Sequence, residues 1–545
     1  RGRINFLPLF YVYFTAMIKN KFINKNYLWL SSISTLIALV VSIPLLYLLF
    51  RAVSHDGFIE LIFRERIFWI TLKSILLVIS VTFFSIIISF FLAHFLTKSD
   101  VPFKKLLTIL CCLPIVIPSY VYGMIFVHLL GPRGKVFQIL NSWNLIDSFP
   151  DLYGFWGATI TLTFLSYPYV FLPLRAAMIS LDDSFEDASR SLGRGRIKTF
   201  YYVTLPLLLP AMRSGGLLVA LYTLSDFGAV ALLRYQTFTW AIMNMYNGAY
   251  NRISAAALSL VLVFFAILIL SMESFLKGAR NFFSSSSTSS SSSLIQLDNK
   301  KWIIFFLILL APIIGALIPI IGLLTWLIKG IIYEDVIVFN FSTIFTSLKV
   351  SFLAAISTMI ISLPISFFAV KYRNKFSLLI EKISYIGFGL PSIVVGLSLV
   401  YFSINFLFPI YQTTAVLIFG YSVLFLPVGV SAVKSTLIQL NPNLEDASRG
   451  LGYSYWKTFI KVTVPLLMPS ILAGSLLIFL LTMKELPLTL VLSPLNFKSL
   501  PTSIWAYASE AFFASAALPA LILILLSGPA SAYLVLKKNN IDVRG

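Results

Sequence analysis

Long apolar stretches separated by short polar ones run along the whole chain. Each is about 20 residues long or longer, the length of a helix that crosses a ~30 Å hydrocarbon core. We therefore expect an all-α polytopic membrane protein with about twelve membrane-spanning helices. The predicted spans are 28–50, 67–96, 106–130, 153–175, 203–233, 254–276, 302–328, 346–370, 379–407, 411–434, 462–491 and 514–536. The first span is too long for a signal-peptide core and lacks a small-residue cleavage site after it, so we expect it to be retained.

The polar stretches divide the chain into two similar halves. The run SSSSTSSSSS at 284–293 is typical of a flexible linker. Matching stretches recur in the same order on either side of it, which predicts two parallel six-helix repeats rather than inverted ones. We expect a cytoplasmic N-terminal segment, two repeats, a cytoplasmic linker and a cytoplasmic tail. Their boundaries are 1–27, 28–276, 277–301, 302–536 and 537–545.

The composition supports a membrane protein and explains the basic charge. Hydrophobic residues make up 59% of the 545 positions and charged residues 11%, whereas a soluble domain is about a quarter charged. The net charge is +20, but with both termini cytoplasmic about 29 of the 41 Lys and Arg fall on the cytoplasmic side. The excess therefore indicates membrane topology, with lipid as a partner and no nucleic acid.

The most strongly repeated stretch is itself polar. EDASRSLGRGRIKTFYYVTLPLLLP at 186–210 and EDASRGLGYSYWKTFIKVTVPLLMP at 445–469 agree at 16 of 25 positions. The acidic pair Glu186 and Asp187 suits a helix start, Gly193 suits a helix end, and a second short helix is expected at 197–203. A simple connector is the alternative interpretation, but the two copies resemble each other more than the surrounding spans do. We therefore predict a docking surface built twice.

This pattern resembles the EAA loop of ABC importer permeases, with Asp at 187 and 446 where many members have Ala. The resemblance covers both halves and implies a permease of the type I kind, with coupling loops at 182–202 and 441–461. It implies two copies of a separate ATP-hydrolysing subunit, which would use ATP and Mg, and a periplasmic or lipid-anchored binding protein. It also implies a bacterial inner-membrane location. The residues that carry it, or follow it at matched positions, are Glu186, Asp187, Ala188, Leu192, Gly193, Pro206, Glu445, Asp446, Ala447, Leu451, Gly452 and Pro465.

We predict no ATP-hydrolysing site, metal site or catalytic site within the chain itself. A phosphate-binding loop requires G-x-x-x-x-G-K-[ST], and Gly134–Lys135 lacks the rest of that motif. The adjacent Cys111 and Cys112 suit burial in a core rather than redox chemistry. The three histidines are scattered. We expect a non-enzymatic permease without a cofactor of its own; a gradient-driven secondary transporter is the alternative from another class.

Two further stretches, at 224–244 and 484–522, resemble the fused two-repeat ferric iron permeases, although permeases for thiamine, phosphonate and polyamine share part of the pattern. The resemblance rests on Ser225, Asp226, Phe227, Gly228, Lys484, Glu485, Leu486, Pro487, Trp505 and Glu510. Asp226, Lys484 and Glu485 are candidate pathway or gate residues, because ionisable groups at membrane depth are costly. Pairing with each other, or a place in the headgroup layer, is the alternative interpretation. Helix breaks near the pathway, or packing alone, would explain Pro114, Pro118 and Pro391.

Overall fold

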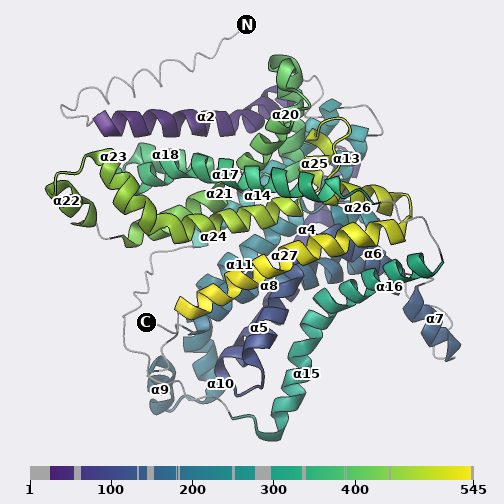
Figure 1. Cartoon of the computed structure of the whole chain (residues 1–545). Coiled ribbons are helices and arrows are strands. Elements are labelled where there is room, and N and C mark those ends of the chain that lie inside the picture. Colours follow the sequence, from purple (N-terminus) through teal and green to yellow (C-terminus); the bar gives the residue numbers. More distant parts are fainter. Residues whose placement is uncertain are drawn as a thin grey trace. The chain divides into compact units, whose positions relative to one another are not determined.

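The structure is a computed structural model that describes residues 25–53, 60, 63–131, 134–143, 153–179, 181, 184–247, 252–276, 296–333, 339–385, 387, 390–440 and 443–541. Most of the predicted N-terminal segment and Ser-rich linker, and the last residues of the predicted tail, lie outside these ranges. The described residues are almost entirely helical, as the sequence predicts (Figure 1).

The helices of the two halves follow each other in the same order. The first half contains α2 (Lys25–Val53), α4 (Glu65–Lys98), α5 (Lys104–Cys112), η1 (Leu113–Val116), α6 (Ser119–Leu130), α7 (Lys135–Ser142), α8 (Phe155–Ile179), α9 (Ser184–Ser191), α10 (Arg196–Thr199), η2 (Phe200–Thr204), α11 (Leu205–Ser225), α12 (Gly228–Leu232), α13 (Phe238–Asn247) and α14 (Arg252–Leu276). The second half contains η3 (Asp298–Lys300), α15 (Lys301–Pro312), η4 (Ile313–Leu317), α16 (Ile318–Ile332), α17 (Ser342–Lys371), α18 (Lys375–Ser384), α20 (Ser392–Phe406), η5 (Phe408–Ile410), α21 (Thr414–Gln439), α22 (Asn443–Gly450), α23 (Tyr455–Thr458), η6 (Phe459–Thr463), α24 (Val464–Met483), α25 (Pro487–Leu492), α26 (Leu500–Ser509) and α27 (Phe513–Ile541).

Ten described helices are long and apolar enough to cross a membrane, and a bent pair makes eleven. The expected count of twelve differs because the third apolar run of each half is not one straight helix. In the first half α5–η1 and α6 meet at 97°, where Pro114 lies in η1 and Pro118 caps α6. In the second half the run is described as α18 and the short α20, which Pro391 caps. The fifth spans also end earlier than predicted, at Ser225 and Met483.

The described chain forms two compact units that are not contiguous in sequence. The smaller unit comprises residues up to 43 together with 356–387 and 425–475. The larger unit comprises 44–355, 388–424 and 476–545. Several long helices of the second half therefore contribute one end to each unit.

Within the larger unit, α4, α8 and α11 pack around small polar residues. Ser89 Oγ donates to the carbonyl oxygen of Tyr167 at 2.7 Å, and the Ser85 and Ser166 hydroxyls lie 3.2 Å apart. Large apolar side chains of α4, such as Phe68 and Phe83, are exposed instead. Helices that pack together in lipid typically place apolar side chains on the outside and small polar side chains at the helix–helix interface.

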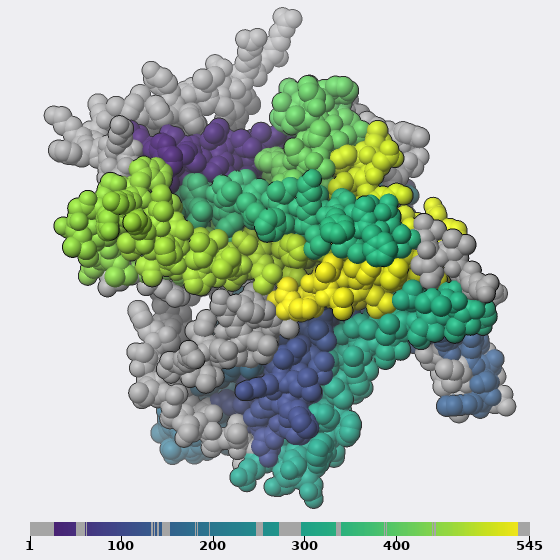
Figure 2. Space-filling model, viewed as in Figure 1, coloured from purple at the N-terminus to yellow at the C-terminus, as the bar shows by residue number. Residues whose placement is uncertain are grey.

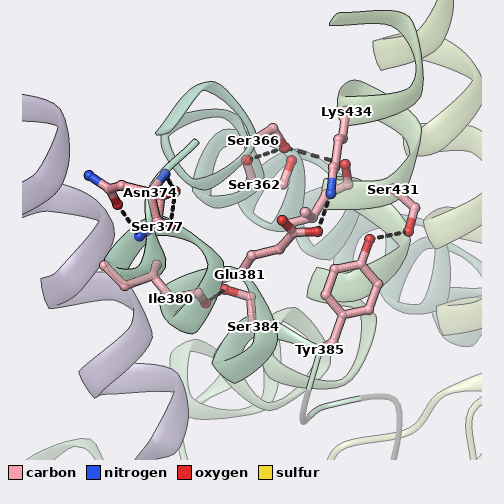
Figure 3. A network of polar contacts seen from close by, with 11 residues as sticks. Ser362, Ser366, Asn374, Ser377, Ile380, Glu381, Ser384, Tyr385, Ser431 and Lys434 are labelled. Atoms are coloured by element: carbon pink, nitrogen blue, oxygen red, sulfur yellow. Dashed lines mark hydrogen bonds and ion pairs between the residues drawn. The ribbon is translucent and has the colours of Figure 1, made fainter. Parts of the chain in front are cut away.

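The smaller unit also packs its helices around small polar residues, and it adds an ion pair. Figure 3 shows Ser366, at the place of Ser89, donating to the carbonyl oxygens of Ser362 and Val430 at 2.8 and 3.3 Å. Lys434 of α21 pairs with Glu381 of α18. The Tyr385 and Ser431 hydroxyls lie 2.8 Å apart, and Asn374 and Ser377 form a capping box that starts α18. These contacts fix α18 against α17 and α21.

The first helix of each half lies along helices of the other half, which hydropathy did not predict. In the smaller unit, the Tyr27 hydroxyl of α2 accepts a hydrogen bond from Asn374 at 3.2 Å. In the larger unit, the Tyr47 hydroxyl of α2 accepts one from Asn405 at 2.9 Å. In the larger unit also, Tyr122 of α6 donates to the carbonyl oxygen of Ile314 in η4 at 3.0 Å. The two halves are therefore interlocked through their first helices.

Candidate functional site

The two repeated segments (184–204 and 443–463) have the same backbone turn. Positions 182–183 and 441–442 of the predicted loops lie outside the described residues. Helix α9 ends with Gly193 at φ +81°, where the Arg194 and Gly193 amides donate to the carbonyl oxygens of Ser189 and Arg190 at 3.2 and 2.9 Å. This is a Schellman motif, which requires a left-handed residue at that place. The second segment repeats it at Gly452, with φ +85° and bonds of 3.3 and 2.9 Å.

A π-helical stretch then leads each segment into the next long helix. Pro206 has no amide hydrogen to donate, so regular α-helical bonding cannot continue across it. The chain instead forms the π-helical η2, in which the Leu205 amide donates to the carbonyl oxygen of Phe200. Before Pro465, η6 does the same with Val464 and Phe459. The proline thus sets how the short helices join α11 and α24.

Hydroxyl groups fasten each short helix to the next stretch. Thr204 Oγ1 of η2 donates to Glu186 Oε1 of α9 at 2.8 Å, and the Ser189 and Thr199 hydroxyls lie 3.2 Å apart. The second segment has the same two links, from Thr463 Oγ1 to Glu445 Oε1 at 2.9 Å and between Ser448 and Thr458 at 3.0 Å. Each glutamate therefore holds its own segment in shape.

The two glutamates differ in their second carboxylate oxygen. Glu445 Oε2 pairs with Lys371 Nζ of α17 at 2.6 Å, with both side chains about three-quarters buried. Glu186 Oε2 lies 3.5 Å from Arg190 Nη2 of its own helix, and that arginine is half exposed. Burial also raises the pKa of Tyr372, which follows the last residue of α17. The second segment is thus held more firmly than the first.

Apolar side chains cover the outside of both segments. Leu192 is 82% exposed and Leu451 is 81% exposed. Three further pairs of exposed apolar residues occur at equivalent positions: Phe185 and Leu444, Ile197 and Trp456, Tyr201 and Ile460. Asp187, Ala188, Asp446 and Ala447 are exposed beside them. The second segment (α22 and α23) projects as the yellow-green knob at the left of Figure 2. An exposed apolar knob of fixed shape is suited to a protein partner.

The candidate pathway residues meet within the larger unit. Asp226 is 7% exposed, accepts a hydrogen bond from the Ala229 amide at 3.0 Å and bonds the Ser119 hydroxyl. Glu485 lies at the equivalent place, bonds the Ser392 hydroxyl and accepts from the Leu488 amide at 3.4 Å. Each carboxyl group thus caps a short helix and reaches the serine that follows Pro118 or Pro391. The two broken third helices and these carboxyl groups form one cluster.

A glycine and an aromatic pair complete this packing. A Cβ atom on Gly228 would lie 2.8 Å from the Tyr120 Cβ atom, so α12 can approach the start of α6 only with glycine there. Phe227 lies against Trp505, with ring centroids 5.3 Å apart. Glu510, by contrast, is exposed at the end of α26.

Lys484 reaches from the second half into the break of the first. Its Nζ atom donates to the carbonyl oxygen of Ile115 in η1 at 2.6 Å and lies 3.5 Å from the Tyr169 hydroxyl. It also lies 6.0 Å from the centre of the Tyr222 ring. The first half has Ser225 at the equivalent position. The cluster is therefore asymmetric, with one ammonium group from one half.

Comparison with known families identifies the protein family to which the chain belongs. Residues 85–281 and 362–536 match the family described as binding-protein-dependent transport system inner membrane component. The chain belongs to this permease family. It is a multi-pass permease component of an ABC importer, a class that works with a separate ATPase and a binding protein.

Individual relatives cover the permease to different extents. It is 34% identical to "Fe(3+)-transport system permease protein FbpB 2" of Haemophilus influenzae, over 92% of the chain and 96% of the relative. It is 25% identical to "Ferric transport system permease protein FbpB" of Actinobacillus pleuropneumoniae, over 68% of the chain and 57% of the relative. It is 33% identical to "Molybdenum transport system permease protein ModB" of Escherichia coli over 27% of the chain and 62% of the relative.

Sequence reasoning missed the internal partners of Glu186 and Glu445, the glutamates of the permease's two repeated segments. Thr204 and Thr463 occupy equivalent places in the two copies, as do Thr199 and Thr458. The identity of these threonines in the two copies could have marked them as important. It did not indicate that Thr204 and Thr463 donate hydrogen bonds to the glutamates. The repeat could not have indicated Lys371, because the first half has His94 at the matching position.

If the repeated segments dock the ATPase, valine at the two turn glycines is expected to weaken that docking. Gly193→Val and Gly452→Val each place a β-branched residue in the left-handed region, which costs about 1–2 kcal/mol of conformational free energy. We therefore expect about ten-fold weaker docking per segment. Asparagine tolerates that region and should keep most of the affinity. The measurement is titration of the solubilised permease with its ATPase. Gly450→Val, in the adjacent helix and without positive φ, is the matched control. Equal affinities for the Gly450 and Gly452 variants would contradict the prediction.

Proposed function

We propose that this permease imports ferric iron delivered by a binding protein. The observation that carries the proposal is the 34% identity to a permease named for Fe(3+) transport, extending over 92% of this chain. The shared length supports a shared cargo, because the likeness includes both halves rather than only the segments that all importers need. Asp226 and Glu485 are the proposed pathway or gate groups, beside helix breaks at Pro114, Pro118 and Pro391.

We also propose how transport is powered. The repeated segments act as two coupling loops, each of which docks one copy of the ATPase, and the two halves alternate between inward and outward access. The matched exposed residues, including Leu192 and Leu451, support a docking role. The distribution of Lys and Arg supports both termini, and both coupling loops, on the cytoplasmic face of a bacterial inner membrane.

Reconstitution tests cargo and power together. The permease, its ATPase and its binding protein are placed in liposomes and supplied with radioactive Fe³⁺, thiamine, phosphonate or polyamine in separate assays. We expect uptake of Fe³⁺ that requires internal ATP and all three components. Uptake of an organic cargo with no uptake of Fe³⁺ would replace the cargo, and uptake by the permease alone in an ion gradient would overturn the ATP-driven mechanism.

A further inference from the structure

The cluster around Lys484 holds more negative than positive charge. The charged groups that act on Asp226 and Glu485 are Lys484 and, for Glu485, Asp226. One ammonium group thus acts electrostatically on two carboxyl groups, and neither carboxylate forms an ion pair with it in the described part of the chain. Unbalanced charge at low dielectric is costly. A proton or a second cation has to balance the cluster.

Oxygen atoms and an aromatic ring surround the Lys484 ammonium group. The Lys484 ammonium group is held by the Ile115 carbonyl oxygen, beside the Tyr169 hydroxyl and the Tyr222 ring. The break between α5 and α6 exposes that carbonyl, because the 3₁₀ segment and Pro118 interrupt regular helical bonding. Backbone carbonyl groups of broken membrane helices commonly coordinate transported cations. A positive group already occupies this place.

An orphaned hydroxyl group points to a further ligand. Tyr120 is 2% exposed, yet its hydroxyl oxygen has no hydrogen-bond partner among the described residues. This hydroxyl is close enough to Glu485 and Tyr421 to interact electrostatically with both. An unpaired buried hydroxyl usually costs about 1–3 kcal/mol. A cation bound between Glu485 and the phenol would satisfy it.

We infer that Asp226, Glu485, Tyr120, Tyr169 and the Ile115 carbonyl oxygen form a niche for a transported multivalent metal cation, and that the Lys484 ammonium group is its exchangeable internal occupant. Carboxylate, phenol and carbonyl oxygens are hard ligands, which suit a hard metal ion better than an organic cation. Lys484 and Glu485 are both partly exposed. The arriving ion displaces Lys484, and Lys484 refills the niche when the ion leaves. This inference rests on the proposed function and specifies its cargo site.

The probe is Tb³⁺, a hard trivalent ion whose luminescence nearby tyrosines excite. It is titrated into the detergent-solubilised full chain. We expect Lys484→Met to strengthen Tb³⁺ binding by about ten-fold or more, because the competing charge is gone, and Lys484→Arg to bind no better than the parent chain. Adding Asp226→Asn or Glu485→Gln to Lys484→Met should reverse the gain. Lys498→Met and Glu510→Gln, both exposed, are the matched controls.

Several outcomes overturn the niche. They are unchanged Tb³⁺ affinity in Lys484→Met, a gain that survives either the Asp226→Asn or the Glu485→Gln substitution, or tighter binding of tetramethylammonium than of Tb³⁺. Thermal unfolding of each variant shows that it is folded, and Lys484→Met with its charge-retaining partner Lys484→Arg keeps the comparison valid if one carboxylate variant fails to fold. The test is independent of the cargo assay: the predicted Tb³⁺ pattern without iron uptake overturns the proposed cargo alone, and iron uptake without that pattern overturns the niche alone.

Discussion

Replacing both Leu192 and Leu451 with aspartate is expected to abolish ATP-coupled uptake while leaving the permease folded. Both side chains are more than four-fifths exposed, so the native fold gains little from them. A central apolar anchor at a protein interface contributes about 2–4 kcal/mol, and an aspartate would also place an unpaired charge in the contact. We expect ATPase affinity to fall by about 30-fold or more at each segment.

The single variants test whether two ATPase subunits dock. If each segment binds one subunit, Leu192→Asp alone leaves the second segment able to bind, and the solubilised permease should still retain one ATPase copy. Leu495→Asp is the control, because Leu495 is 78% exposed in a loop outside both segments. Normal ATP-coupled uptake by the double variant, or an equal loss in Leu495→Asp, would remove the docking role from these leucines.

The sequence predicted the helices and the repeats because both depend on local pattern. Hydropathy is a sum over consecutive residues, so it located long spans such as α4 and α17 well. It could not locate the 97° bend between α5–η1 and α6, since the apolar run continues through the bend. The prolines at 114 and 118 marked the place, but packing against other helices determines the angle.

Contacts between distant residues were the part that pattern could not supply. The sequence predicts Glu186 and Glu445 as coupling residues, and the structure adds that each carboxylate is already bonded to a threonine of its own segment. The bond from Lys484 to Ile115 joins the two halves, and neither composition nor spacing predicts such a pair. The crossed contacts of α2 likewise depend on how the halves assemble.

The same substitution in the two segments should give unequal results. Glutamine keeps an oxygen that accepts from Thr204 or Thr463, so Glu186→Gln and Glu445→Gln differ mainly in the ion pairs they remove. Glu445→Gln leaves Lys371 without its carboxylate at a largely buried place, a loss of about 1–2 kcal/mol after allowance for screening. Glu186→Gln removes only a long contact with a half-exposed arginine, a loss below about 0.5 kcal/mol.

Thermal unfolding in detergent and ATPase titration both measure this difference. We expect a lower unfolding midpoint and weaker docking for Glu445→Gln than for Glu186→Gln. The difference between the two variants should be smaller in 1 M salt, where the Debye length is about 3 Å. Lys371→Met added to Glu445→Gln should recover much of the loss, because it removes the unpaired ammonium group rather than restoring the pair. Equal effects of the two glutamine variants would mean that Lys371 does not support the second segment. A larger effect at Glu186 would mean that this carboxylate, and not its partner copy, carries the more important contact with the ATPase.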